Sequence, residues 1–266
     1  MVHTAKQGKR GAHLMKVFYF TATGNSLAVA KKIGGELISI PQIIDSDDLN
    51  FSGESIGVVF PIFNWREPKM VRHFLDKARF DTPYLFAVGT YGNLPGAAMS
   101  TIQSRAKKNG YEFHYTNHLL MVDNYLPLFD IDKEIKKMPK KDTDEKLKQI
   151  AHDIHSAKHS TIKTDPVIKA ISAVVGSRMP PDAYAQKFTI NEDCNLCGTC
   201  AQVCPTDNIE IVEKVGFHFR CEGCLACIHN CSKNAMHLPR QRSETRWRHP
   251  DVKTREIIKA NSLPKS

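Results

Sequence analysis

The residues best suited to chemistry in this sequence are its cysteines, which are confined to one segment. All eight cysteines of the 266-residue chain lie between positions 194 and 231. They form two runs with the same C-x2-C-x2-C-x3-C spacing: Cys194, Cys197, Cys200 and Cys204, then Cys221, Cys224, Cys227 and Cys231. Thiolates are soft ligands, and groups of four bind either zinc or iron–sulfur clusters.

The spacing favours iron and sulfur over the alternatives. Zinc ribbons separate two cysteine pairs by a long spacer, whereas each run here places three cysteines in one tight turn with a fourth soon after. The first run ends in Cys204-Pro205, as bacterial iron–sulfur runs do. A disulfide framework suits small secreted chains, and this one has no evident secretion signal. Two structural zinc ions and a disulfide framework remain the competing interpretations.

Residues 186–239 resemble the bacterial ferredoxins that bind two [4Fe–4S] clusters. In that family the fourth cysteine of each run binds the cluster held by the other run. The resemblance therefore implies one cluster on Cys194, Cys197, Cys200 and Cys231, and another on Cys221, Cys224, Cys227 and Cys204. Ser232 departs from the family, which has a proline there, and we expect it to alter hydrogen bonding near the sulfur without removing a ligand.

Composition indicates an ordinary soluble protein with charge at its ends. Hydrophobic residues make up 41% of the chain and charged residues 24%. The longest apolar run, residues 56–63, is too short to span a bilayer. Residues 1–16 carry +4 and residues 239–266 carry +5, which together account for the whole net charge of +9. We expect residues 1–14 and 240–266 to be solvated basic ends, and the free thiols to require a reducing cytoplasm.

The start of the chain predicts a strand, a small loop and a helix. Residues 17–20 are apolar and β-rich, and a helical pattern begins at Leu27. The loop between them, Thr21-Ala22-Thr23-Gly24-Asn25-Ser26, resembles the phosphate loop of flavodoxins, with Ser26 where that family usually has threonine. It contains no Lys or Arg, so amides and hydroxyls would hold a phosphate. An ordinary turn or helix cap is the alternative.

Residues 15–165 continue as alternating strands and helices. Strands are expected near residues 37–40, 56–60, 84–88 and 118–122, and helices near 68–78, 95–108 and 143–160. This alternation predicts an α/β fold with a doubly wound parallel sheet. The flavodoxin resemblance implies the strand order 2-1-3-4-5, which holds its ligand outside the carboxyl ends of strands one and three.

The loops at that edge supply candidate contacts for FMN. Trp65 and Tyr91 are predicted to stack on the flavin ring, although Trp65 equally suits a loop anchor. Asn124 and Tyr125 are weaker candidates. The full set of predicted flavin residues is Thr21, Thr23, Gly24, Asn25, Ser26, Asn64, Trp65, Thr90, Tyr91, Gly92 and Asn93.

Residues 166–185 are expected to connect the two domains. They begin with a short amphipathic helix that includes Ile168 and Ile171, followed by the stiff pair Pro180-Pro181. We expect the apolar face of this helix to dock against one of the domains. The domain order is then an FMN domain at residues 15–165, a linker, and a ferredoxin domain at 186–239.

Taken together, residues 15–239 resemble the fused flavodoxin–ferredoxin iron–sulfur flavoproteins of anaerobes. The resemblance implies electron transfer between two [4Fe–4S] clusters and FMN, serving a redox protein partner. One alternative is a flavin-dependent reductase of a quinone or nitro-compound, although no acid/base pair is evident in the sequence. Another is an iron–sulfur redox sensor whose basic ends bind nucleic acid, although no helix-turn-helix or aromatic–basic platform is present.

Overall fold

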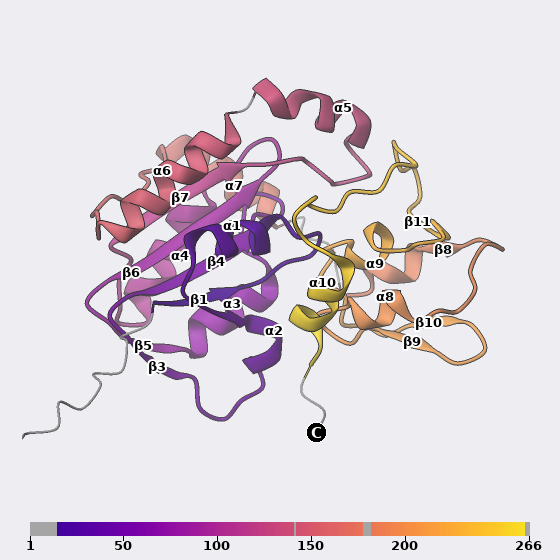
Figure 1. Ribbon diagram of the computed structural model, residues 1–266, viewed down its shortest axis with the longest axis horizontal. Coiled ribbons are helices and arrows are strands. Elements are labelled where there is room, and N and C mark those ends of the chain that lie inside the picture. Colours follow the sequence, from indigo (N-terminus) through magenta and orange to yellow (C-terminus); the bar gives the residue numbers. More distant parts are fainter. Residues whose placement is uncertain (1–14, 141, 178–181, 264–266) are drawn as a thin grey trace, which may run out of the picture.

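A parallel sheet forms the larger part of the protein, and a smaller cysteine-rich module lies beside it (Figure 1). The computed structural model describes residues 15–140, 142–177 and 182–263. The expected basic extension at residues 1–14 and the Pro180-Pro181 pair lie outside the described residues.

The central sheet has the predicted flavodoxin-like order. Its five strands are arranged β2-β1-β4-β6-β7, and every neighbouring pair is parallel. In chain order this is 2-1-3-4-5, so the predicted fold class is confirmed. The strands are β1 (Lys16–Tyr19), β2 (Glu36–Ser39), β4 (Ile56–Pro61), β6 (Leu85–Tyr91) and β7 (Tyr115–Leu120).

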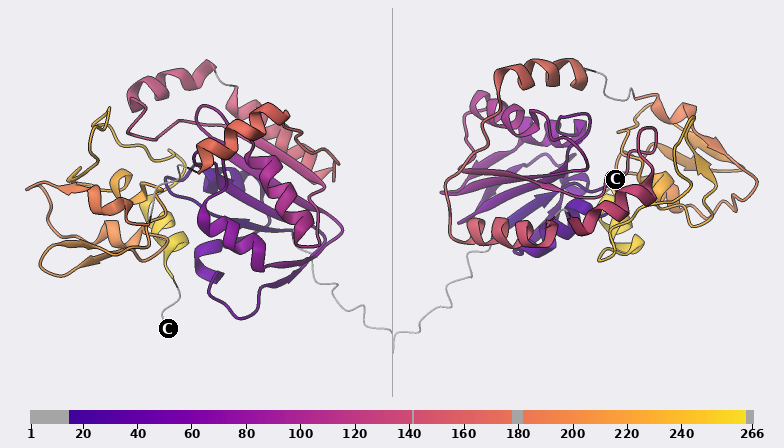
Figure 2. Two further views of the ribbon diagram at one scale, coloured as in Figure 1. Left: turned by 180° about the vertical axis from the view of Figure 1, so that it is seen from behind. Right: turned by 90° about the horizontal axis from the view of Figure 1, so that it is seen from above.

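Helices cover both faces of the sheet (Figure 2). One layer contains α1 (Asn25–Ile33) and α6 (Thr143–His155), and the other contains α3 (Lys69–Lys77) and α4 (Ala98–Lys108). Successive strand residues point to opposite faces, so Val17 packs under the first layer and Phe18 under the second. Burial on both sides explains why the strands are continuously apolar. Smaller elements of this part are α2 (Ile40–Ile43), β3 (Asn50–Ser52), β5 (Arg79–Asp81), α5 (Ile131–Lys137) and the 3-10 turn η1 (Met138–Lys140).

The helix in the predicted linker, α7 (Pro166–Gly176), packs differently from the expectation. Its small face lies inward, where the Ser172 hydroxyl accepts the Ala97 amide N–H at 2.9 Å. The apolar side chains that were expected to dock remain in solvent, with Val167 65% and Val174 58% exposed. Small residues permit the close approach to Arg66 and Ala97, which a face of branched side chains would prevent. No helix within the described ranges is long and apolar enough to cross a membrane.

The cysteine-rich module consists of two short antiparallel pairs and two single-turn helices. Strand β8 pairs with β11, β9 pairs with β10, and α8 contacts α9. Its core also receives Leu126 and Ile131 from the larger part, so the two parts share buried surface. The elements are the 3-10 turn η2 (Tyr184–Lys187), β8 (Thr189–Ile190), α8 (Thr199–Gln202), β9 (Ile209–Ile211), β10 (Val215–Phe217), α9 (Ala226–His229) and β11 (Met236–His237).

The carboxyl-terminal segment is ordered rather than a solvated tail. After the cysteine-rich module the chain returns to the sheet and forms α10 (Thr254–Asn261), which lies between the two parts in Figure 1. Val252 and Ile257 are buried in the same core as Val17. The sequence pattern missed this because the apolar residues are few and the many Lys and Arg side chains suggest solvation.

One close approach inside the sheet gives a direct test of the fold. Gly57 of β4 lies opposite Phe86 of β6, and a Cβ at Gly57 would overlap the Phe86 ring. We expect Gly57→Ala to lower the free energy of unfolding by about 1–3 kcal/mol, the usual range for overpacking. Anaerobic urea unfolding followed by circular dichroism measures it.

The matched control is Lys107→Ala, an exposed position on α4. It should change the free energy of unfolding by less than about 0.5 kcal/mol. Equal stability of the Gly57→Ala variant and the wild type would contradict the strand register described here.

Candidate cofactor site at the carboxyl edge of the sheet

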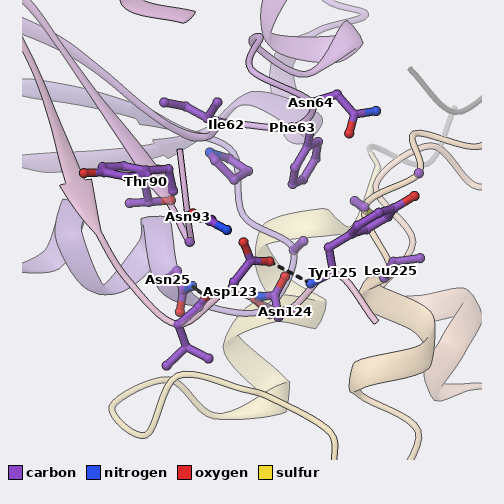
Figure 3. Close-up of a pocket in the computed structure, with 18 of the residues that line it drawn as sticks. Asn25, Ile62, Phe63, Asn64, Thr90, Asn93, Asp123, Asn124, Tyr125 and Leu225 are labelled. Carbon is purple, nitrogen blue, oxygen red and sulfur yellow. Dashed lines mark hydrogen bonds between the residues drawn. The ribbon is translucent and has the colours of Figure 1, made fainter. Parts of the chain in front are cut away.

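A cavity of about 370 Å³ lies where the carboxyl ends of β1, β4, β6 and β7 face the cysteine-rich module (Figure 3). This volume falls within the range of roughly 300–1,000 Å³ typical of cofactor and ligand sites. All but one of the residues predicted to contact a flavin line it: Thr21, Thr23, Asn25, Ser26, Asn64, Trp65, Thr90, Tyr91, Gly92 and Asn93. The strand order therefore brings together residues from separate loops, as expected at a topological switch point.

The loop at residues 21–26 leads from β1 into α1 and forms one wall. Gly24, the predicted residue that does not line the cavity, has φ +95° immediately before the helix and donates its N–H to Thr21 Oγ1 at 3.2 Å. Within the described part of the chain, the amide N–H groups of Ala22, Thr23 and Asn25 donate no hydrogen bond. Unpaired amides beside a helix N-terminus are the donors that bind a phosphate.

Two hydroxyls fix this loop to its neighbours across the sheet edge. The Thr23 hydroxyl accepts a hydrogen bond from Asn124 Nδ2 at 2.7 Å. The Ser26 and Thr90 hydroxyl oxygens lie 2.9 Å apart, so one donates to the other. Ser26, where the flavodoxin loop usually has threonine, thus uses its hydroxyl to contact Thr90.

The loop after β4 makes a tight turn at the cavity rim. Asn64 and Trp65 have φ values of +46° and +65°, and the backbones of Phe63 and Arg66 exchange two hydrogen bonds of 2.9 Å. Left-handed backbone is uncommon for a bulky residue and tends to occur at functional sites. Trp65 also lies against the backbone of Gly96, where a Cβ would overlap its side chain. The turn therefore anchors Trp65 while keeping it at the rim.

Tyr91 and Gly92 lie at the end of β6 and line the cavity, as predicted. A Cβ at Gly92 would overlap Asp123, so only glycine permits this approach of two loops. The Tyr91 ring packs edge-on against His118 of β7, with centroids 5.0 Å apart, and burial raises the Tyr91 pKa. Tyr91 therefore lines the cavity from a position supported by His118.

The cavity lining includes Phe63, which was not singled out from the sequence, and Tyr125, which was a weaker candidate. Figure 3 shows Phe63 and Tyr125 together on the side of the cavity toward the cysteine-rich module, with Leu225 beside Tyr125. Phe63 belongs to the apolar run that follows β4, which is a usable signal. Leu225 lies between cysteines of the second run, and no pattern in the sequence reveals that it faces the sheet.

The remaining wall comes from the second cysteine run itself. Residues 222–225, including Cys224, line the cavity. The Glu222 carboxylate accepts the backbone N–H of Lys69 at 2.5 Å, and Lys69 Nζ donates to the Cys221 carbonyl at 2.8 Å. Burial raises the pKa of Glu222 to about 7, while the charge of Lys69 lowers it. These contacts fix the second run against the start of α3.

The cysteines assemble crosswise, with each fourth cysteine beside the triplet of the other run. The outer set, defined as Cys194, Cys197, Cys200 and Cys231, lines a small cavity of about 20 Å³. Burial, with smaller contributions from the nearby charges of Cys231 and Cys194, raises the pKa of Cys200 to about 11. Cys197 is exposed, and the Thr199 hydroxyl lowers its pKa.

The inner set consists of Cys221, Cys224, Cys227 and Cys204. Burial is the main cause that raises the pKa of the first three, and the charge of Cys204 raises each of them further. Buried thiols resist ionisation, so cation binding must supply the free energy that holds them as thiolates. Within the described ranges, no three His, Cys, Asp or Glu side chains are arranged to hold a single metal ion.

Backbone amides point at the sulfur atoms in a repeated pattern. Cys204 Sγ accepts the Asn208 N–H and Cys231 Sγ accepts the Ala235 N–H, both at 3.3 Å. Such hydrogen bonds stabilise thiolates and tune the potential of a cluster. The hydrogen bond to Cys231, which Ser232 follows, is thus as long as the one to Cys204, which Pro205 follows.

Comparison with known families agrees with this chemistry. Residues 172–250 match the family described as the 4Fe-4S dicluster domain. The chain thus joins a flavodoxin-like sheet to a 4Fe-4S dicluster domain, as the sequence predicts, and [4Fe–4S] clusters are its cofactors. Its role is redox electron transfer.

Two solved structures each resemble part of the chain. A candidate flavoprotein from Bacteroides uniformis is 16% identical, with 47% of this chain and 97% of that one covered at a TM-score of 0.32. Two-electron reduced flavodoxin from Megasphaera elsdenii is 17% identical, with 39% and 84% covered at a TM-score of 0.27. No curated protein matches the chain. The assignment of the sheet rests on its own strand order.

Double variants test the crosswise grouping of the cysteines. If Cys204 and Cys224 share a cluster, the double variant Cys204→Ser/Cys224→Ser loses one cluster and keeps about half the iron and acid-labile sulfide. The matched variant Cys204→Ser/Cys197→Ser removes a ligand from each cluster and should retain little of either. Iron and sulfide analysis after anaerobic purification measures both.

The opposite pattern, with iron retained in Cys204→Ser/Cys197→Ser and lost in Cys204→Ser/Cys224→Ser, would assign Cys204 to its own run. Zinc in place of iron and sulfide in the wild-type chain would reject the cluster chemistry altogether.

Proposed function

We propose that this chain carries electrons between a redox protein partner and an FMN bound in the cavity, with the two [4Fe–4S] clusters between them. The observation that carries the proposal is the position of Cys224, which belongs to the inner cysteine set and also to the cavity wall. A ligand in this cavity and a cluster on the inner set would be direct neighbours.

The fit of FMN rests on the chemistry of the lining. The loop at residues 21–26 offers unpaired amides for a phosphate, while Phe63, Trp65 and Tyr125 offer flat surfaces for a ring system. Among the residues that the structure describes, the lining includes no Lys or Arg, so neutral donors would hold the phosphate. When bound, the flavin would supply a group that holds one or two electrons, where each cluster passes one.

The difference in burial between the cysteine sets supports an order of transfer. Cys197 of the outer set is exposed, and the adjacent Leu196 is 41% exposed. Cys221 and Cys227 of the inner set are buried. A partner protein would therefore meet the outer cluster first, and the inner cluster would connect it to the flavin.

One observation favours a second candidate, a flavin-dependent reductase of a small acceptor. The cavity wall includes Leu94 and Leu128, which are 57% and 59% exposed, so the cavity reaches the surface. Asp123 and Glu222 also line it. Steady turnover of a quinone or nitro-compound by the FMN-loaded protein would favour this activity, and its absence would favour electron transfer alone.

The proposed order predicts the outcome of rapid mixing with a reduced bacterial ferredoxin, a donor too large to enter the cavity. In the wild type, cluster absorbance should bleach before flavin absorbance. Cys227→Ser removes a ligand of the inner set without altering the cavity lining, so the outer cluster should still be reduced while the flavin is reduced far more slowly. Stopped-flow absorbance measures both signals.

Cys194→Ser is the matched variant for the outer set. It should slow the reduction of both the inner cluster and the flavin. FMN and iron content are measured for each variant beforehand. Flavin reduction at the wild-type rate in both variants, or flavin bleaching before the clusters in the wild type, would contradict the proposed order.

A further inference from the structure

The carboxyl-terminal residues contact the loop proposed for phosphate binding. We call residues 242–261 the return segment, because they run from the dicluster module back to the sheet (Figures 1 and 2). The Arg242 N–H donates to the Leu126 carbonyl at 2.9 Å where the segment begins. Near its end, Gln42 Nε2 donates to the Lys259 carbonyl at 2.6 Å and the Ser39 hydroxyl donates to the Ala260 carbonyl.

Three groups of the return segment donate hydrogen bonds to the loop at residues 21–26. The Trp247 indole Nε1–H donates to Asn25 Oδ1 at 2.9 Å. The His249 backbone N–H donates to the Thr23 carbonyl at 2.9 Å, and Asn261 Nδ2 donates to the Thr21 carbonyl at 3.2 Å. Gly24 lies so close to this segment that a Cβ there would be 2.9 Å from Val252 Cβ.

These bonds determine which way the loop amides point. In a trans peptide the carbonyl and the following N–H point in opposite directions. Because the Thr21 carbonyl is bonded to the return segment, the Ala22 N–H is directed away from it.

The Asn25 side chain is fixed just as firmly. It accepts from an indole, which only donates, and its Nδ2 donates to the Val122 carbonyl, which only accepts, at 3.3 Å. Both polar atoms of the Asn25 side chain are therefore engaged.

The same segment also contacts the loops that carry inner-set cysteines. Asn261 Nδ2 donates to the carbonyl of Val203, the residue before Cys204, at 2.8 Å. The Trp247 N–H donates to His229 Nδ1 at 3.1 Å, which leaves Nε2 as the donor to the Asn124 carbonyl at 2.8 Å. His229 lies on α9, between Cys227 and Cys231. The cluster-bearing loops and the phosphate loop thus share one set of supports.

We propose that the return segment is part of the flavin-phosphate site, with Trp247 as the positioning residue that gives the protein its preference for FMN over riboflavin. The inference rests on the proposed FMN site. None of the described residues that line the cavity is Lys or Arg, so the proposed affinity for the phosphate depends on the orientation of neutral donors. A change in that orientation should therefore weaken the phosphate contact and leave the contacts to the ring.

The test compares FMN and riboflavin binding to the cluster-loaded, full-length protein by anaerobic quenching of flavin fluorescence. Wild type should bind FMN more tightly than riboflavin. Trp247→Phe keeps the aromatic packing but removes the donor to Asn25, so FMN binding should weaken about tenfold while riboflavin binding stays the same. The control is Lys107→Ala, an exposed position on α4 outside both the cavity lining and the return segment, and it should bind both flavins as the wild type does.

A second variant shows whether Trp247 acts through Asn25. Asn25→Ala removes the acceptor, so adding Trp247→Phe to it should cause no further loss of FMN affinity. Iron content, measured for every variant, should remain at the wild-type level.

Equal weakening of FMN and riboflavin by Trp247→Phe would show a general structural role and overturn the inference. So would a wild type that binds both flavins equally well, although the flavin site itself would then stand. A wild type that binds neither flavin would reject the proposed FMN site and this inference with it.

Discussion

The contact on which this architecture depends joins a buried carboxylate to the start of a helix. Glu222 is 4% exposed, and its carboxylate accepts the Lys69 N–H at the amino end of α3. The partial positive charge of a helix N-terminus offsets part of the cost of removing a carboxylate from water. Because Cys221 and Cys224 lie on either side of Glu222, this contact fixes the inner cysteine set against the cavity.

Features that depend on local spacing were predictable from the sequence. The duplicated cysteine runs predicted the dicluster domain, since three thiols two residues apart form one turn whatever surrounds them. The apolar run at residues 17–20 and the loop after it predicted β1, the turn and α1, because burial on both faces requires a continuously apolar strand. Trp65 and Gly92 were placed at the cavity for the same reason, since each follows the carboxyl end of a strand.

Features that depend on contacts between distant residues were not predictable. Trp247 lies far from Asn25 in the sequence, and a single hydrogen bond between them has no periodicity that a pattern could detect. The return segment looked like a solvated tail because its Lys and Arg side chains conceal the few buried residues, such as Val252. Leu225 lines the cavity because the cysteine-rich module packs against the sheet.

The position of α10 also changes how the chain should be divided. Val252, Ile257 and Ala260 belong to the core under the first helical layer, so the last elements of the chain fold with the first. The dicluster module is then an insertion into a discontinuous domain rather than an independent second domain that follows the first. A single proteolytic cut between α7 and η2 would leave both fragments held together by α10, and neither half is a natural unit for expression on its own.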